Sequence, residues 1–135
     1  MPFVDTNIFI RYLTKDDLDK AQACFELFNQ AASNQVALTT TEAVITEVVY
    51  VLSSKKTYGL ARHEIRARLY PLLSVSGLQL SHRQTYLRAL DLYTLYALDF
   101  EDAVIVAQME RQKIKDLYSY DRGFERISGI TRQEP

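Results

Sequence analysis

Short apolar runs alternate along the chain with longer segments in which apolar residues recur every three or four positions. The longer period is that of an amphipathic helix, and the short runs have the length of buried strands. The long segments predict helices over residues 7–13, 17–32, 42–54, 61–73, 83–96 and 101–112. The short runs predict strands at 2–4, 36–38, 78–80 and 117–120, then a short helix from Asp121 and an edge strand near Ile130.

Strands separated by helices require crossover connections, which predict a mostly parallel sheet covered on both faces. The chain has only 4 glycines and 3 prolines and shows no repeat or linker, so we expect residues 1–135 to form a single domain. In open parallel sheets, ligands bind beyond the carboxyl ends of the strands. The residues that follow each strand are therefore the first candidates for chemistry.

Aspartates stand at the ends of two predicted strands. Asp5 follows the first strand and Asp121 follows a later one. Each precedes a helical stretch, so an N-cap role explains either residue taken singly. Asp99 is also a plausible N-cap, with Asp102 three residues later as a capping-box partner.

Asp102 is difficult to explain by capping alone. At 100° per residue it falls on the same side of its helix as Ile105, Val106 and Met109, which we expect to face the core. Burying an unpaired carboxylate costs several kcal/mol or shifts its pKa. Asp102 therefore needs hydrogen-bond donors, an arginine or a bound cation. Glu47 lies at the margin of the apolar side of its own helix, where exposure to solvent explains it equally well.

If these four acids converge, their mutual repulsion requires compensating positive charge. Hard divalent cations such as Mg²⁺ or Mn²⁺ prefer oxygen ligands. Zinc is disfavoured, because His63 and His82 are far apart in the sequence and Cys24 is the only cysteine. Carboxylates with Mg²⁺ or Mn²⁺ suit the hydrolysis of phosphodiesters, because the metal activates water and offsets charge on the leaving oxygen.

The overall charge limits the kind of partner. A net charge of −1 and a pI near 6.1 argue against a surface that coats nucleic acid generally. One basic stretch could still contact phosphates, and a solvated helix face explains it equally well. Its residues are Lys55, Lys56, Arg62, Arg66 and Arg68.

The single cysteine, Cys24, excludes an internal disulfide and is expected to be an inert core thiol. No apolar window approaches the roughly 18–20 residues that span a bilayer, and no basic leader precedes the N-terminal apolar stretch. These features predict a soluble cytoplasmic protein with no membrane partner.

At the acidic residues the sequence resembles the PIN-domain family, and within it the VapC-type toxins of toxin–antitoxin pairs. Four segments carry the resemblance in the family's order and spacing: FVDTNIFIRYL at 3–13, TEVVYVL at 46–52, LDFEDAVIVAQ at 98–108 and YSYDRGFERISGI at 118–130. Each segment is weakly specific alone, but four in register make a strong match.

The resemblance implies a three-layer α/β/α sandwich around a mostly parallel sheet of four to five strands. It also implies a Mg²⁺- or Mn²⁺-dependent endoribonuclease that acts on tRNA, rRNA or mRNA, forms a homodimer or higher oligomer and is blocked by a cognate antitoxin. The family's acids map onto Asp5, Asp102 and Asp121 as metal ligands, and onto Glu47 as a ligand or as the residue that positions water. The supporting positions are Thr6, Asn7, Asp99 and Ser119.

Two other interpretations compete with this one. A non-catalytic RNA-binding or interaction module could keep the fold, although the intact set of acids argues against it. A phosphoacceptor signalling domain also gathers aspartates at strand ends, but it needs a lysine after its last core strand, where this chain has Asp121 and Arg122. The residues do not distinguish RNA from DNA as a substrate.

Overall fold

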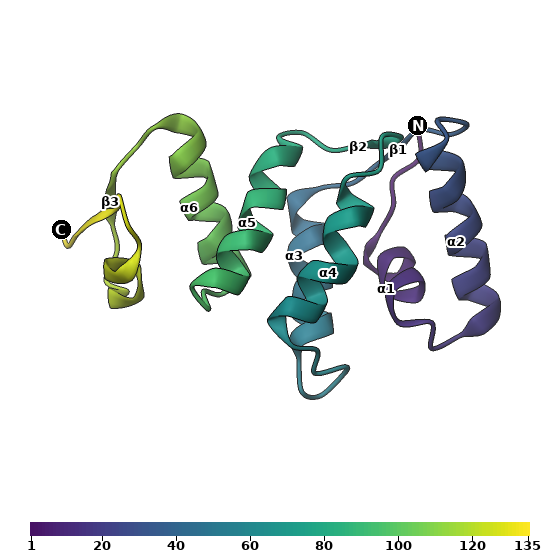
Figure 1. The fold of residues 1–135 in the computed structure, drawn as a ribbon, viewed down its shortest axis with the longest axis horizontal. Coiled ribbons are helices and arrows are strands. Elements are labelled where there is room, and N and C mark those ends of the chain that lie inside the picture. Colours follow the sequence, from purple (N-terminus) through teal and green to yellow (C-terminus); the bar gives the residue numbers. More distant parts are fainter.

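The computed structural model describes residues 1–135 and combines six α-helices with short parallel strands (Figure 1). This arrangement confirms the expected α/β class. The helices are α1 (Thr6–Thr14), α2 (Leu18–Ala32), α3 (Glu42–Ser53), α4 (Arg62–Leu73), α5 (Arg83–Leu95) and α6 (Phe100–Gln112). The strands are β1 (Leu38–Thr39), β2 (Leu78–Gln79), β3 (Asp116–Tyr118) and β4 (Thr131–Gln133), and the 3-10 helix η1 (Arg122–Arg126) lies between the last two.

Polar side chains set the starts of several helices. Asp5 accepts a hydrogen bond from the Ile8 amide at 3.3 Å, and Asp17 accepts one from the Lys20 amide at 3.1 Å. These bonds satisfy amides that have no partner inside a helix, so they place the N-termini of α1 and α2. All six predicted helices are confirmed, with boundaries that differ by a few residues.

The first sheet pairs β1 with β2 in parallel, with Leu38 opposite Leu78. The predicted strand at 2–4 is present only as a single parallel bridge from Phe3 to Thr39. In that bridge the Val4 amide donates to the Thr39 carbonyl at 2.8 Å, and the Thr39 amide donates to the Pro2 carbonyl at 2.9 Å. Residues 3–5 therefore form the outer edge of this sheet.

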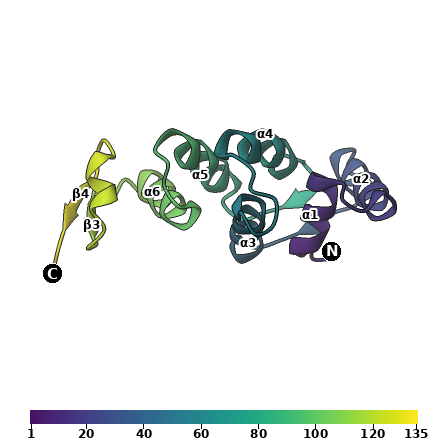
Figure 2. The same cartoon turned by 90° about the horizontal axis from the view of Figure 1, so that it is seen from below.

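The second sheet pairs β3 with β4, also in parallel, and no strand joins it to the first sheet. The expectation of one sheet with four to five strands is therefore corrected to two separate two-stranded sheets. Figures 1 and 2 show the second sheet at the end of the molecule opposite the N-terminus, beyond α6. After α6 the Ile114 amide donates to the Met109 carbonyl at 2.9 Å, and the chain then enters β3 of the second sheet.

The core consists of the apolar faces of the helices, with Phe9, Phe28, Leu52, Leu69 and Leu90 among its buried residues. Val106 and Met109 are buried as predicted, but Ile105 is 40% exposed. The expectation for Ile105 was wrong, because it lines an open groove shared by α3 and α6 rather than the core.

Cys24 is buried, which confirms its predicted place in the core, and burial raises the pKa of its thiol. A thiol with a raised pKa is a poor nucleophile. None of the helices is long and apolar enough to cross a membrane.

Candidate functional site

The first group of candidate residues is the N-terminal pair, Asp5 and Glu47. The two side chains come from the start of α1 and the middle of α3. The Thr6 hydroxyl donates to Oε2 of Glu47 at 2.8 Å, so it links the two helices at this point. Asn7 lines the same cleft, whose volume is about 540 Å³. Asp5 acts as the N-cap of α1, and one of its carboxylate oxygens accepts a hydrogen bond from the Ile8 amide.

The second group is the C-terminal triad, Asp99, Asp102 and Asp121. Asp102 lies in the first turn of α6 and is partly buried. Burial raises the pKa of Asp102, and the nearby carboxylates of Asp121, Asp99 and then Glu101 raise it further. Asp102 therefore lies in a region of concentrated negative charge.

The other two members of the triad begin helices. The Asp121 carboxylate accepts from the Gly123 amide at 2.8 Å, and the Ser119 hydroxyl accepts from the Asp121 amide at 3.0 Å. These bonds confirm the N-cap interpretation of Asp121 and assign Ser119 a local role. Asp99 precedes α6 but makes no side-chain capping bond, so the expected capping box with Asp102 is wrong. The Asp99 carboxylate is left without a backbone partner, next to Asp102.

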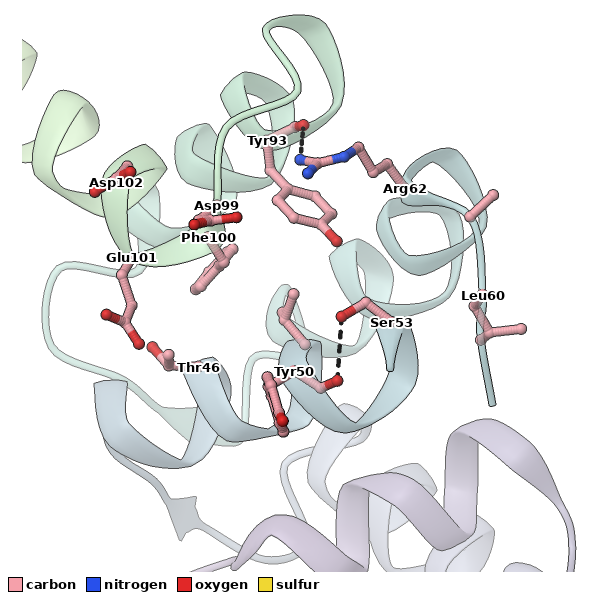
Figure 3. Close-up of a pocket in the computed structure, with 12 residues that line it drawn as sticks. Thr46, Tyr50, Ser53, Leu60, Arg62, Tyr93, Asp99, Phe100, Glu101 and Asp102 are labelled. Atoms are coloured by element: carbon pink, nitrogen blue, oxygen red, sulfur yellow. Dashed lines mark hydrogen bonds between the residues drawn. The ribbon is translucent and has the colours of Figure 1, made fainter. Parts of the chain in front are cut away.

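A cavity of about 560 Å³ opens beside the triad, between α6 and helices α3, α4 and α5. Figure 3 shows Asp99 at its edge and the Glu101 side chain directed toward Thr46 of α3. On the opposite side, Arg62 donates to the Tyr93 carbonyl at 2.9 Å and to the Leu98 carbonyl. Its guanidinium also lies 4.3 Å from the centre of the Tyr93 ring. Arg62 is therefore held by the protein at the rim of the cavity.

The two acidic groups do not converge within one chain. Glu47 and Glu101, the sequence neighbour of Asp102, line a common groove along α3 and α6. No three acidic, histidine or cysteine side chains lie close enough together to hold a metal ion. The expected convergence of four carboxylates is not observed, because Asp5 follows the edge of the first sheet and Asp121 follows a strand of the second.

Arginine and lysine do not neutralise the four candidate acids. The six ion pairs of the protein involve Asp16, Asp91, Glu64, Glu110, Glu125 and Glu134 instead. The candidate set contains only carboxylate oxygens, which is the donor chemistry that Mg²⁺ and Mn²⁺ prefer. The residues fit such an ion in type, although a single chain does not assemble them around one.

A polar network beside Asp5 escaped the sequence analysis. The Tyr58 hydroxyl donates to Asp16 at 2.6 Å, and Arg11 pairs with the other oxygen of Asp16 at 2.9 Å. The hydrogen bonds from Tyr58 and Arg11 lower the pKa of Asp16. All three side chains line the Asp5 cleft. The close spacing of Arg11 and Asp16 was a weak signal, but Tyr58 lies too far along the chain for spacing to indicate it.

The predicted basic stretch divides into two kinds of residue. Besides Arg62, Arg66 pairs with Asp91 at 2.7 Å and Arg68 donates to the Leu13 carbonyl at 3.1 Å. Lys55 and Lys56 lie exposed on the turn that follows α3. The exposed lysines are therefore better placed to bind a phosphate than the arginines, which already have partners within the protein. RNA binding by this stretch stays a prediction.

Comparison with known proteins identifies the family. The model of the PIN domain family matches residues 3–130, which include both acidic groups. No curated protein shows a significant match to the chain. PIN domains are generally nucleases that use divalent metal ions, so the match supports a nuclease-type activity and binding to nucleic acid. With a match over almost its whole length, the chain belongs to the PIN domain family.

Proposed function

We propose that this protein is a Mg²⁺- or Mn²⁺-dependent endoribonuclease whose active site contains Asp5, Glu47, Asp102 and Asp121. The observation that carries the proposal is the partly buried Asp102, which faces Asp121 and Asp99 and has no ion-pair partner. Uncompensated negative charge in a partly buried place opposes folding, and such groups are characteristic of functional sites. A bound divalent cation is the simplest source of the missing positive charge.

Asp5, Asp102 and Asp121 are the proposed ligands of the ion, and binding it requires that the two acidic groups be brought together. Glu47 is either a further ligand or the residue that positions the attacking water. The hydrogen bond from Thr6 fixes the direction of the Glu47 carboxylate. A divalent ion bound by these oxygens would supply positive charge that activates water and offsets the charge on the leaving oxygen.

The finer proposal is that the protein is the toxin of a type II toxin–antitoxin pair. The four matching segments at 3–13, 46–52, 98–108 and 118–130 support it, because they resemble VapC-type toxins in order and spacing. The substrate is then a tRNA, an rRNA or an mRNA, cleavage occurs in the cytoplasm, and a cognate antitoxin blocks the active site.

The test is cleavage of purified RNA by the purified wild-type protein, first without metal and then with Mg²⁺ or Mn²⁺, followed by sequencing of the RNA ends. Asp5→Asn and Asp121→Asn are the matched controls, because asparagine also caps helices and preserves the fold. We expect specific new ends only with metal and only with the wild-type protein. Full cleavage by Asp5→Asn would refute the site.

The same experiment distinguishes the ribonuclease from the alternative, a non-catalytic RNA-binding module. An RNA-binding module would retain RNA in a filter-binding assay and produce no new ends with any metal. To test the toxin proposal, the wild-type chain and the Asp5→Asn variant are each expressed in cells. Expression of the wild type is expected to arrest growth, and expression of Asp5→Asn is not. Growth arrest by both would exclude a toxin that acts through cleavage.

A further inference from the structure

The first sheet has an open edge along residues 3–5. The bonds to β1 use the Pro2 carbonyl and the Val4 amide. Since neighbouring residues of a strand direct their backbone groups to opposite sides, the amides of Phe3 and Asp5 face away from β1, and neither forms a backbone hydrogen bond. The Phe3 side chain is 70% exposed. This edge lacks a neighbouring strand.

The second sheet has a matching open edge along β3. The Lys115 carbonyl and the Ser119 amide bond to the β4 side. Because successive residues of a strand direct their backbone groups to opposite sides, the backbone groups of Asp116 and Tyr118 point away from β4. No strand lies on that side of β3. Tyr118 is 68% exposed. An unpaired edge of this kind is a site of association.

The two edges of one chain are far from each other. They lie at opposite ends of the molecule, with α5 and α6 between them (Figures 1 and 2). The amides of Lys113 and Ile114 bond back to Glu110 and Met109, so β3 stays tied to the end of α6. The surface area of 7947 Å² is about 10% above the value expected for a monomer of 15.6 kDa. The chain thus exposes surface that a compact protein buries.

We propose that two copies of this chain exchange their C-terminal segments, residues 114–135. In the exchanged dimer, β3 of each copy pairs in parallel with residues 3–5 of the other copy and completes its sheet. The exchange places Asp121 of one copy, together with Asp102 and Asp99 that lie near it in the same copy, beside the N-terminal pair of the other. Each active site is then composed of two chains. This last statement rests on the proposed function, whereas the strand exchange does not.

Backbone directions define the register of the new pair. Phe3 directs its amide and carbonyl outward, so it must lie opposite a residue that bonds toward β4. With Phe3 opposite Leu117, the Phe3 amide donates to the Asp116 carbonyl and the Tyr118 amide donates to the Phe3 carbonyl. Asp5 then lies opposite Ser119, and Asp121 follows two residues later at the same end of the sheet. Adjacent strands lie about 4.8 Å apart, so the carboxylates reach one site.

Reciprocal exchange also explains why assembly stops at two copies. Each copy offers one edge at residues 3–5 and one edge at β3, and a twofold axis satisfies all four edges at once. We therefore expect a dimer rather than a filament.

The structural test is cross-linking between two single-cysteine chains in a Cys24→Ala background. Phe3→Cys is made in one chain and Leu117→Cys in a second chain that carries a tag of different size. After the two are unfolded and refolded together, we expect a disulfide-linked heterodimer on a non-reducing gel and a dimeric mass by light scattering. Replacing Leu117→Cys by Ser128→Cys, which is exposed away from the β3 edge, is expected to give no cross-link.

The outcomes that overturn the exchange are equally specific. A monomeric mass would exclude the exchange. In a chain that carries both Phe3→Cys and Leu117→Cys, a disulfide formed within that one chain would show that the two edges join in cis. A dimer with no Phe3–Leu117 cross-link would show association through another surface.

The functional test mixes two inactive variants, Asp5→Asn and Asp121→Asn, and refolds them together. In an exchanged dimer, one of the two sites of each mixed dimer combines two wild-type halves. Since random pairing makes half of the dimers mixed, activity is expected to return to about a quarter of the wild-type value. If the wild type is active and the mixture is inactive, composite sites are excluded. If the cross-link forms and the wild type is inactive, the exchange stands and the nuclease proposal fails.

Discussion

Asp102 lies partly buried beside Asp121, and neither carboxylate is paired with an arginine or a lysine. Burial first, and then the charge of Asp121, raises the pKa of Asp102. A carboxyl whose pKa is higher in the folded state than in the unfolded state destabilises the fold when it is ionised. The ionised Asp102 carboxylate therefore lowers the free energy of unfolding, and residues that lower stability in this way are characteristic of functional sites.

Asp102→Asn is expected to stabilise the metal-free protein while it abolishes cleavage. At neutral pH the variant removes an unfavourable charge, so Tm should rise by about 1–3 °C. As the pH falls below the pKa of an unfolded aspartate, both states of the wild type become protonated and the difference should vanish. Thermal melts at pH 7 and pH 3 measure this. Glu26→Gln, at an exposed position of α2, is the control, and a lower Tm for Asp102→Asn at pH 7 would contradict the argument.

Divalent metal is expected to stabilise the wild type without any RNA present. A ligand that binds only the folded state at 100 times its Kd adds about 2.7 kcal/mol. Mg²⁺ or Mn²⁺ should therefore raise Tm in a concentration-dependent way, and chelator should reverse the shift. Asp102→Asn and Asp121→Asn should show little or no shift. An equal shift in these variants, at matched ionic strength, would place the metal elsewhere.

Thr6 is expected to act through Glu47. Thr6→Val removes the hydroxyl that donates to Glu47 at 2.8 Å and keeps the shape of the side chain. We expect kcat to fall about tenfold with little change in KM, because a misplaced carboxylate affects the reaction more than binding. Thr6→Ser restores the donor and should recover most of the rate. If serine does not rescue the rate, the hydroxyl is not the positioning group.

Lys55 and Lys56 are the members of the basic stretch that are expected to contact RNA. Changing both to glutamate should weaken RNA binding and lower the slope of log K against log salt by about 2. Filter binding over a salt series measures the slope. Arg66→Glu should mainly lower the free energy of unfolding, because Arg66 pairs with Asp91. Lys20→Glu on α2 is the matched surface control, and an equal effect there would indicate general charge rather than contact.

Gly77 is expected to tolerate no side chain. A Cβ atom at this position would lie 2.2 Å from the Ala31 carbonyl oxygen and 2.7 Å from that of Val36. Because the backbone can move away from the new atom only with large strain, Gly77→Ala should lower the free energy of unfolding by about 2–4 kcal/mol. Gly129→Ala meets no atom within 4 Å but has a φ of +85°, and it should cost about 1 kcal/mol. Urea denaturation compares the two, and equal costs would refute the steric explanation.

Helices were predictable from the sequence because their signals are local. The apolar period placed six helices within a few residues of their observed ends, and Asp5 was recognised as a possible cap of the first. Strand pairing was not predictable in the same way, because strands of two or three residues carry little periodicity and their partners are distant. The turn at Lys113 and Ile114, after which the chain enters the second sheet, is not marked by any apolar pattern.

The candidate site shows the same division. The caps formed by Asp5 and Asp121 follow from nearest-neighbour chemistry and were predicted. The bond from Thr6 to Glu47 joins residues 41 positions apart, and the sequence identified both residues but not their contact. The contacts that occupy Arg62 and Arg66 were also invisible, since a charge pattern does not show which cations already have partners.

The helix cap at Asp5 has a consequence for inheritance. Asparagine caps a helix as well as aspartate does, and one nucleotide separates their codons. If Asp5 is a ligand in the proposed metal site, a single mutation to asparagine removes activity and leaves the protein folded. In an exchanged dimer such a chain would still supply its intact C-terminal acids to an active partner, so each mixed dimer would keep one active site and an intact allele would not be silenced by its neighbour.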